Sequence, residues 1–478
     1  MRRRTKIVAT LGPASDDANT LCAMINAGLD VARLNFSHGD PDDHRKRAAA
    51  LRAAAKSCGR DVGLLGDLQG PKIRVQRFEN HSVALADGDS FFLDSTLGLM
   101  DGNQDGVGVA LDTLHEDLKV DDLLLLNDGM ITLKVASIEG TRIHTTVVHG
   151  GILSDHKGIN LKGGGLSAAA LTDVDKQNIK LAAELEADFL AVSFVRSAKD
   201  VREARELFEA AGGRGLIVAK IERVEAVDDI DSIIEATDVI MVARGDLGVE
   251  MGYAELTGIQ KRLIRKTRKQ HKIVITATQM MESMIQNPIP TRAEVSDVAN
   301  AVIDGTDAVM LSGETAVGKY PVEAISAMAE VCVGAEKFPL VAGTTTHRMQ
   351  DRFQQVDEAI AMATMYTANH MSVRAIIALT ESGTTTRWMS RIRSDIPIYA
   401  FTPHEATNRR VALYRGVYPI SFATNVENPR RLYQDIFNTL LHYELVEVDD
   451  LVIFTKGDTE GLRGGTNAMK VLTVKREL

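Results

Sequence analysis

The chain has 478 residues, a formal net charge of -10, and apolar and charged fractions of 45% and 25%. This length exceeds what one ordinary core buries and predicts two or three domains of a globular protein, while the negative balance argues against general binding to nucleic acids or membrane surfaces. Cys22, Cys58 and Cys332 have no metal-type spacing and form no disulfide framework, which favours the cytoplasm. No long apolar segment is present, so we predict no export signal and no membrane span.

Strand and helix patterns alternate through residues 1–70. Short apolar runs at Lys6–Thr10, Val31–Asn35 and Gly63–Leu68 predict buried parallel strands. Helical spacing between them predicts helices at Thr20–Gly28 and Arg45–Lys56. Residues 1–70 therefore form the first part of a β/α domain.

The pattern changes at Gly70-Pro71. Residues 71–157 carry short alternating segments broken by Asp-Gly and Glu-Gly pairs, and Met130–Ser137 with Thr141–Val148 predicts a hairpin. We expect a small inserted β-barrel domain that could act as a lid. The glycine run from Lys162 to Gly165 marks the return of the chain, either as a hinge or as an ordinary linker.

Strand–helix alternation resumes in residues 158–340. The helix at Val224–Glu235 places apolar residues on one face, and the helix that starts at Thr291 shows a capping-box pattern with Glu294. With the three earlier strands this makes eight strands, which predicts an eight-fold (β/α)8 TIM barrel of the α/β class. The five strands predicted here are Phe189–Phe194, Leu216–Ala219, Val239–Ala243, Lys272–Thr278 and Ala308–Leu311, with a helix at Lys199–Ala211.

Residues 341–478 predict a separate C-terminal α/β domain. Its expected strands are Ala375–Leu379, Ile398–Phe401, Pro419–Ala423, Leu451–Phe454 and Val471–Val474, alternating with helices at Asp357–Asn369, Thr386–Arg393, Ala406–Tyr414 and Pro429–Leu445.

Polar residues gather where the predicted barrel strands end, which is where barrel enzymes place their chemistry. Glu222 and Asp246 supply two carboxylates. This number suits magnesium, which completes its coordination shell with water and substrate oxygens. Lys220 with Glu222 also fits a structural salt bridge, and the glycine-containing loop Ala243–Gly248 also fits a turn without a ligand. These residues predict a magnesium-dependent enzyme for a small anionic substrate; the set is Arg33, Asn35, Ser37, Asp67, Ser193, Lys220, Glu222, Asp246, Thr278, Ser312 and Glu314.

Seven stretches make the chain resemble the pyruvate kinase family, in the family's order and across the whole barrel. The resemblance is to the bacterial type and its potassium-independent group. The stretches are Lys6–Pro13, Arg33–Gly39, Gly70–Arg74, Lys220–Glu222, Ala243–Gly248, Ala277–Met280 and Leu311–Thr315.

This resemblance implies phosphoryl transfer from phosphoenolpyruvate to ADP, giving pyruvate and ATP, the final step of glycolysis. It implies that Glu222 and Asp246 hold Mg2+, with Mn2+ as a substitute. Lys220 and Arg33 would neutralise the phosphoryl group. Backbone N–H groups of Gly245 and Asp246, with the Thr278 hydroxyl, would receive the substrate carboxylate, and Thr278 would lie on the side from which the enolate is protonated.

For the nucleotide, the resemblance implies contacts from Asn35, His38 and Arg74. Many relatives have a nucleotide-side lysine where this chain has Val174, and whether Lys176 compensates stays open.

The potassium-requiring relatives bind the ion with positions that match Asn35, Ser37 and Asp67, and many carry Glu where this chain has Lys72. A lysine ammonium can supply a fixed monovalent charge near the site. We therefore predict that potassium is not required, with a solvated hinge lysine as the alternative for Lys72.

The C-terminal domain carries a hydroxyl-rich loop before a helix, which suits a phosphate but equally fits an N-cap loop without a ligand. The resemblance favours an allosteric site for a sugar-phosphate or nucleotide activator and implies a homotetramer. The expected effector residues are Thr380, Ser382, Gly383, Thr384, Thr385 and Arg463.

Two other functions compete with this interpretation. A magnesium-dependent lyase or aldolase acting on pyruvate enolates would explain Glu222 and Asp246, but not the lid, Arg74 or the third domain. A non-catalytic metabolite sensor would not need Lys220 and Thr278 beside both carboxylates.

Overall fold

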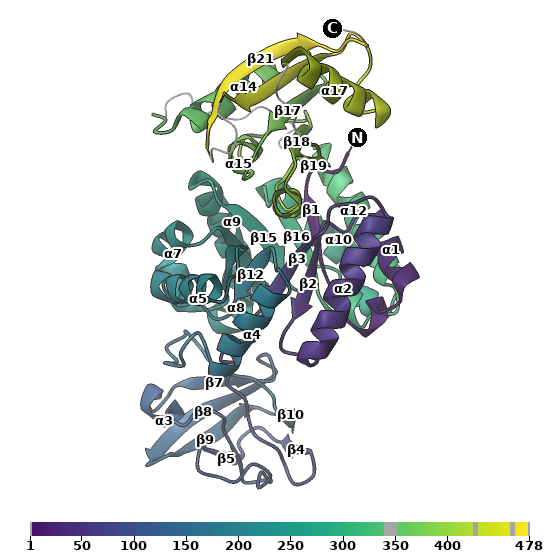
Figure 1. The fold of residues 1–478 in the computed structure, drawn as a ribbon. Helices are drawn as coiled ribbons and strands as arrows, with labels where there is room; N and C mark the ends of the chain where they lie inside the picture. Colours follow the sequence, from purple (N-terminus) through teal and green to yellow (C-terminus); the bar gives the residue numbers. More distant parts are fainter. Residues whose placement is uncertain (1, 339–351, 424–428, 459–463, 477–478) are drawn as a thin grey trace.

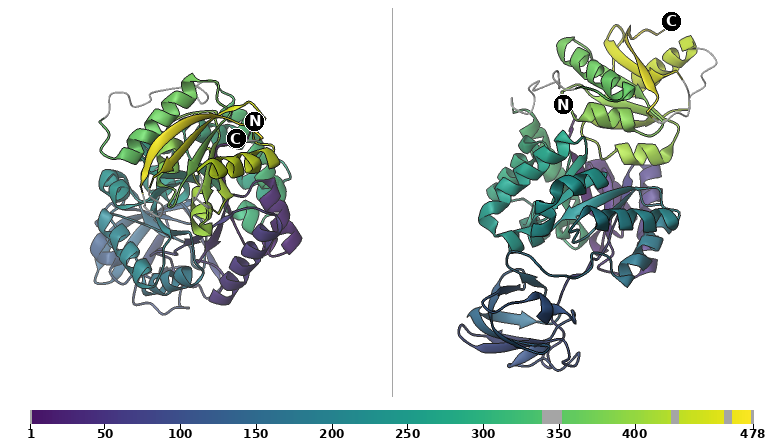
Figure 2. Two further views of the ribbon diagram at one scale, coloured as in Figure 1. Left: turned by 45° about the horizontal axis from the view of Figure 1, so that its top comes forward. Right: turned by 90° about the vertical axis from the view of Figure 1, so that its left-hand side faces the viewer.

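The computed structural model describes residues 2–338, 352–423, 429–458 and 464–476. Three bodies lie in a row, with a ring of helices around strands in the middle (Figure 1). The views in Figure 2 show the same order, with a β-rich body at one end and an α/β body at the other. Within the described ranges, no helix has the length and apolar character needed to cross a membrane.

The central body is a closed barrel of eight strands in the order β1-β16-β15-β14-β13-β12-β3-β2, and each neighbouring pair is parallel. This confirms the predicted TIM barrel. The strands are β1 (Lys6–Thr10), β2 (Val31–Asn35), β3 (Gly63–Asp67), β12 (Phe189–Val192), β13 (Leu216–Ile221), β14 (Val239–Ala243), β15 (Ile273–Ala277) and β16 (Ala308–Leu311).

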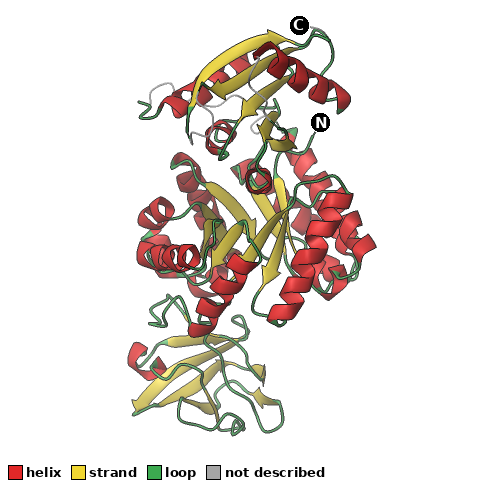
Figure 3. Ribbon diagram, viewed as in Figure 1, coloured by secondary structure: helices red, strands yellow, loops and turns green. Residues whose placement is uncertain are grey.

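Helices surround these strands, as Figure 3 shows in red. They are η1 (Pro13–Ser15), α1 (Ala18–Ala27), α2 (Pro41–Ser57), α4 (Asp173–Glu184), α5 (Ala198–Ala210), α6 (Val224–Asp228), α7 (Ile230–Ala236), α8 (Arg244–Met251), α9 (Tyr253–Lys269), η2 (Glu282–Ile285), α10 (Arg292–Asp304), α11 (Gly313–Ala316) and α12 (Pro321–Glu336). The capping box of Thr291 and Glu294 is present at the start of α10, as predicted.

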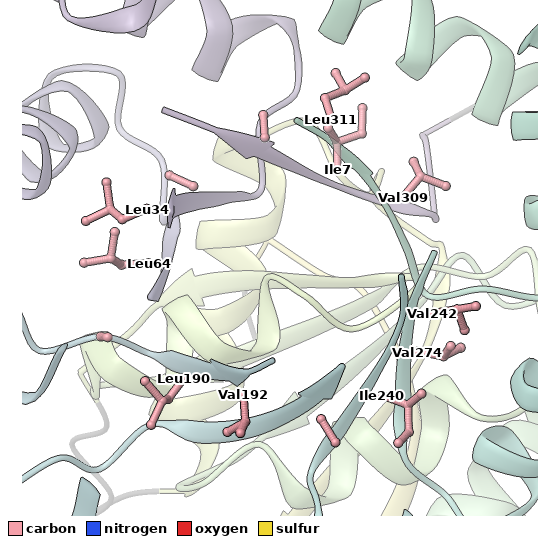
Figure 4. Packing of buried hydrophobic residues seen from close by; sticks show 14 of the residues in the cluster. Ile7, Leu34, Leu64, Leu190, Val192, Ile240, Val242, Val274, Val309 and Leu311 are labelled. Atoms are coloured by element: carbon pink, nitrogen blue, oxygen red, sulfur yellow. The ribbon is translucent and has the colours of Figure 1, made fainter. Parts of the chain in front are cut away.

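Barrel strands are buried on both faces because their side chains alternate. Outward-facing residues such as Ile7, Leu190 and Ile240 pack under the helices (Figure 4). Their neighbours in the sequence, such as Val8 and Met241, belong to a second cluster that fills the interior. The barrel is therefore a packed core, and chemistry is confined to its ends.

Two predicted elements differ from the structure. Residues 224–235 form two helices, because the backbone leaves helical geometry at Asp229 (φ -92°, ψ 20°). The buried apolar face continues across the break through Val227, Ile230 and Ile234. The hydrophobic spacing therefore predicts one continuous helix and gives no sign of the break. The expected loop Ala243–Gly248 is the start of α8, where packing overrides the low helix propensity of glycine.

The inserted β-rich body contains a six-stranded sheet, β11-β7-β8-β9-β5-β6, and a pair, β10-β4. The predicted hairpin is β8 with β9. Strand β11 pairs with β7 and lies just past residue 157, the expected end of this domain. The elements are β4 (Ser82–Leu85), β5 (Ser90–Asp94), β6 (Gly106–Gly108), α3 (Leu114–Asp117), β7 (Leu123–Leu126), β8 (Ile131–Glu139), β9 (Arg142–His149), β10 (Gly151–Ser154) and β11 (Ile159–Leu161).

The C-terminal body has a five-stranded sheet in the order β19-β18-β17-β20-β21, with only β21 antiparallel. The expected boundary at 341 lies outside the described residues. The elements are α14 (Val356–His370), β17 (Ala375–Leu379), α15 (Thr384–Ser390), β18 (Ile398–Thr402), α16 (Glu405–Val411), β19 (Val417–Ser421), α17 (Pro429–His442), β20 (Leu451–Gly457) and β21 (Thr466–Thr473).

Aspartates at the amino ends of barrel strands attach the C-terminal body. Asp188 and Asp307 each accept a backbone N–H from the start of a neighbouring strand, at 2.9 Å from Leu64 and 3.0 Å from Val274. Arg409 and Arg391 of the C-terminal body pair with these two carboxylates. The amino end of the barrel is thus covered, which leaves the carboxyl end facing the β-rich body.

Candidate active site

A charged network lies at the carboxyl ends of β2, β3 and β13. Asp67 is fully buried, with Arg33 Nε 2.6 Å from its Oδ2 and Lys220 Nζ 3.1 Å from its Oδ1. Lys220 Nζ also lies 3.1 Å from Glu222 Oε1 and donates to Ser193 Oγ at 2.6 Å. The structure therefore brings Arg33, Lys220 and Glu222 together, with Asp67 at the centre.

Burial and charge oppose one another in this network. Burial raises the pKa of Asp67, but Lys220 and Arg33 outweigh it and leave that pKa below its usual value. Burial lowers the pKa of Lys220, but Asp67 and Glu222 outweigh it and raise the net value. Both groups therefore stay ionised, and a buried ammonium is held ready for an anion.

Glu222 and Asp246 form the candidate metal site. Glu222 is buried, and its Oε2 accepts the Phe194 N–H at 2.7 Å. Burial raises the pKa of Glu222; Lys220 opposes this effect, and the nearby charge of Asp246 adds to it. A carboxylate whose pKa is raised by a neighbouring negative charge is suited to a divalent cation, which removes that repulsion.

The donor set fits magnesium better than zinc. Among the described residues, no group of three or more His, Cys, Asp or Glu side chains could hold a metal. Zinc sites need three or four protein ligands, whereas magnesium binds one or two carboxylates and completes its shell with water and substrate oxygens. Glu222 and Asp246 meet the second requirement.

Lys72 lies apart from the other residues of the predicted monovalent-cation region. Its ammonium is 3.0 Å from Asp246 Oδ1 and 3.7 Å from Asp128 Oδ1 of the β-rich body. Burial lowers the pKa of Lys72, but Asp246 outweighs it and the net pKa is raised. Asp67 pairs with Arg33 and Lys220 instead. Lys72 is not the solvated hinge lysine of the alternative interpretation.

Thr278 adopts an uncommon backbone conformation at the end of β15, with φ 68°. Its hydroxyl accepts the Gly245 N–H at 2.9 Å and donates to the Ala277 carbonyl at 2.6 Å. A β-branched residue in the left-handed region is strained, and such strain concentrates at functional sites. Thr278 and the first turn of α8 are therefore joined directly.

Arg244 was missed as a site residue, although it lies inside a quoted stretch. Its Nη2 donates to the Thr278 carbonyl at 2.7 Å, and its Nη1 lies 2.7 Å from Asp297 Oδ2. The side chain is 7% exposed, so this buried arginine fixes the strained peptide of Thr278. An arginine beside Gly245 in the sequence was the available signal.

The remaining strand-end residues divide into two kinds. Glu314 accepts the backbone N–H groups of Met281 and Ser312, at 3.1 and 2.7 Å, so it supports the loops. Asn35 Oδ1 accepts the Ser37 N–H at 3.2 Å, and the His38 N–H donates to the Asn35 carbonyl at 3.2 Å. Asn35, Ser37 and His38 therefore share one turn after β2.

Arg74 lies on the crossing to the β-rich body, where its Nη1 donates to the His156 carbonyl at 2.9 Å. Among the described residues, no hydrogen bond or ion pair joins Arg74 to the turn of Asn35 to His38. Lys176 pairs with Asp173 at 3.1 Å on the exposed start of α4, and Val174 is 52% exposed.

The predicted effector loop lies between β17 and α15, and its hydroxyls bond within the C-terminal body. Thr380 Oγ1 accepts the Gly383 N–H at 2.9 Å, and Ser382 Oγ lies 2.8 Å from Thr384 Oγ1. Thr385 Oγ1 lies 2.7 Å from Thr466 Oγ1 on β21. Arg463 lies outside the described residues.

The fold is an α/β barrel, and its candidate site combines two carboxylates with the cations Arg33 and Lys220. Residues 2–325 match the family described as "Pyruvate kinase, barrel domain", and residues 358–472 match "Pyruvate kinase, alpha/beta domain". The chain belongs to the pyruvate kinase family.

Curated relatives align over nearly the whole chain. The pyruvate kinase of Buchnera aphidicola subsp. Schizaphis graminum is 53% identical over 476 residues, 99% of this chain and 98% of the relative. Pyruvate kinase II of Salmonella typhimurium is 53% identical over 477 residues, 99% of each. The pyruvate kinase of Haemophilus influenzae is 55% identical over 422 residues, 87% of this chain and 88% of the relative.

Proposed function

We propose that this protein transfers the phosphoryl group of phosphoenolpyruvate to ADP, giving pyruvate and ATP, as the final step of glycolysis. The observation that carries this proposal is the Lys220 ammonium, which is buried between Asp67 and Glu222. Phosphoryl transfer needs preorganised positive charge more than covalent chemistry, and a buried ammonium supplies it without reorganisation.

Each predicted residue has a place in this proposal. Glu222 and Asp246 hold Mg2+, for which Mn2+ can substitute. When bound, the ion would stabilise negative charge on the substrate oxygens. Lys220 and Arg33 neutralise the phosphoryl group during transfer. The carboxylate of the substrate takes the Gly245 and Asp246 N–H groups at the start of α8, where a helix favours an anion. To bind the carboxylate, the Gly245 N–H must give up its hydrogen bond to the Thr278 hydroxyl.

Thr278 has a second role on the opposite side of the enolate. Its hydroxyl, released by Gly245, delivers a proton to the enolate carbon through water, and Arg244 keeps the hydroxyl in place. Asn35, His38 and Arg74 contact the nucleotide phosphates. The β-rich body closes as a lid over residues 158–340 and excludes water, which would otherwise hydrolyse the phosphoryl group.

Potassium independence is a finer part of the proposal. Lys72 brings a permanent charge to Asp246 from the first crossing to the lid, and Asp67 has two cations already. The site thus holds fixed monovalent charge of its own. The Lys72 ammonium lies beside Asp246 and not beside Asn35, Ser37 and Asp67. Its charge therefore acts next to the proposed magnesium site.

The C-terminal domain is proposed to bind a sugar-phosphate or nucleotide activator through Thr380 to Thr385. Supporting this, the loop gathers hydroxyl groups beside the helix start of α15. A homotetramer and a cytoplasmic location complete the proposal, both from the family resemblance.

The test is pyruvate formation from phosphoenolpyruvate and ADP with magnesium, with and without potassium and with no effector. Equal rates support the kinase and the Lys72 interpretation together. Activation by potassium of about ten-fold or more keeps the kinase and removes the role of Lys72. Silence in both, persisting with sugar phosphates and AMP, contradicts the enzyme and favours a metabolite sensor.

A lyase or aldolase is the second enzymatic candidate, and the structure gives it less support. Such an enzyme would use Glu222 and Asp246. It would not bind a nucleotide, and it would not need a lid that contacts the site through Lys72 and Asp128. Incubation with pyruvate and aldehydes, with product analysis, separates the two reactions.

A further inference from the structure

The return crossing from the lid to the barrel is attached at several points. Gly163, Gly164 and Gly165 have φ of 90°, 80° and 109°, which L side chains rarely adopt. The Gly163 N–H donates to the Glu250 carbonyl at 3.0 Å, and the Gly165 N–H donates to Glu225 Oε1 at 2.5 Å. These glycines therefore shape a fixed contact and do not form a loose linker.

Glu250 lies at the centre of this attachment, near the end of α8. Its side chain is 5% exposed, and Oε1 accepts Asn160 Nδ2 of β11 at 3.4 Å. Oε2 accepts the Val224 N–H at 3.2 Å. One buried carboxylate thus contacts the last strand of the lid and the turn after β13, while its own backbone belongs to the helix that starts at Arg244.

These segments carry both metal-binding carboxylates. Glu222 lies two residues before Val224, and Asp246 lies one helical turn before Glu250 on α8. Displacing the contact would move the backbone on both sides of the candidate metal site. Carboxylates that hold ligand-bearing segments in this way influence metal affinity without touching the ion.

Arg223 provides a parallel connection. Its Nη1 donates to the Leu166 carbonyl of the return crossing at 3.0 Å, and its guanidinium lies 5.4 Å from the centre of the Phe194 ring. The Phe194 N–H is the donor to Glu222 Oε2. The lid is therefore linked to the segment of Glu222 by two routes, one through Arg223 and one through Glu250. Of these two routes, the one through Glu250 also includes α8.

We propose that Glu250 is a positioning residue, which fixes the return crossing of the lid relative to the carboxylates of Glu222 and Asp246. The position of the lid and the geometry of the metal site are then set together. This inference rests on the proposed function for its kinetic consequence, but its effect on metal affinity does not depend on turnover.

The test substitutes Glu250→Gln, with Glu255→Gln as the matched control. An amide oxygen can accept only one of the two N–H groups, and its NH2 group then faces the other donor. Glu255 is exposed and lies on α9, and its side chain makes no hydrogen bond or ion pair with the residues that the structure describes. Burial raises the pKa of Glu250 to about 7, so both variants are measured on the alkaline side of neutrality, where the carboxyl is ionised.

Three quantities are measured: Mn2+ affinity of the free enzyme by electron paramagnetic resonance, kcat and KM, and hydrogen exchange of residues 159–166. For Glu250→Gln we expect a loss of about 10- to 100-fold in Mn2+ affinity and in kcat, together with faster exchange. KM for ADP should change less than kcat. Glu255→Gln should match the wild type in all three.

Faster exchange with unchanged Mn2+ affinity would overturn the proposal, because Glu250 would then only attach the lid. Unchanged exchange would overturn it as well. If Glu250→Gln fails to fold, Asn160→Ala removes the lid side of the contact and must weaken Mn2+ binding in a chain whose Trp388 fluorescence stays native. A wild type that binds Mn2+ but makes no pyruvate would contradict the proposed function and leave this test intact.

Discussion

Lys220 Nζ lies 3.1 Å from Asp67 Oδ1, although the whole lid and two barrel helices, α4 and α5, separate the two residues in the sequence. The Asp67 side chain is buried, with an exposed fraction of 1%, and that of Lys220 is partly exposed, at 12%. Burial lowers the pKa of Lys220, and the charge of Asp67 opposes this effect and keeps the ammonium protonated. Asp67 is therefore the electrostatic centre of the site.

Replacing Asp67 with asparagine should shift the pH dependence of the reaction. Asp67 raises the pKa of Lys220, so its loss lowers that pKa and moves the alkaline decline in kcat to lower pH. At neutral pH we expect kcat to fall by about 10- to 100-fold, because a tuned group typically contributes 10²–10⁴-fold and Glu222 still supports Lys220. Initial rates across neutral and alkaline pH test this; an alkaline limb that does not move would contradict it.

Thr278 should tolerate serine but not alanine. Serine keeps the hydroxyl that bonds Gly245 and Ala277, so kcat should stay within about ten-fold of the wild type. Alanine removes it and should lower kcat by about 100-fold or more, the scale of a lost proton-transfer group. Single-turnover measurements of enolate protonation separate this effect from binding. Equal activity of the two variants would exclude the hydroxyl.

Asp94 should stabilise the lid in a pH-dependent manner. Its oxygens accept from Thr96, Thr141 and Arg142, and although burial opposes the shift, these bonds lower the pKa of Asp94 to about 2. Relative to an unfolded pKa of about 3.9, this difference contributes about 2–3 kcal/mol. Because the folded pKa is the lower one, the contribution is complete above about pH 4 and disappears as pH falls through the folded value.

The variant Asp94→Asn should therefore speed hydrogen exchange of lid strands at neutral pH and converge with the wild type in acid. Asp112→Asn is the control, because Asp112 is exposed and its carboxylate forms no hydrogen bond or ion pair within the described part of the chain. A constant difference between Asp94→Asn and the wild type at all pH values would show that the carboxylate charge is not responsible.

Arg391 should hold the C-terminal domain on the barrel. Arg391 and Asp307 are each 2% exposed, and removing one member of a buried ion pair costs about 3–5 kcal/mol. Arg391→Met should therefore lower the urea midpoint followed by Trp388, the only tryptophan, whose ring centre lies 4.8 Å from that of His271 on the barrel.

The control for this experiment is Arg374→Met in the same domain. Arg374 is 58% exposed and lies 3.9 Å from Asp450, so its loss should cost less than about 1 kcal/mol. Similar midpoints for the two variants would mean that the buried pair does not secure the interface.

The sequence determined the fold class and most elements, because hydrophobic periodicity is a local property that buried strands cannot avoid. Four barrel strands, β1, β2, β14 and β16, have the bounds that their apolar runs predicted. Residues such as Lys220, Glu222 and Asp246 were also found from the sequence, since the carboxyl ends of barrel strands converge by topology.

Only the tertiary structure decided which charges meet. Lys72 was expected to bring a charge near the site, but its partners, Asp246 and Asp128, could not be predicted, because the partner of a long flexible side chain depends on distances that no spacing encodes. The contacts of Arg244 and Glu250 could not be predicted for the same reason. Each acts by holding backbone groups of segments that are distant in the sequence, and such contacts exist only after the chain has folded.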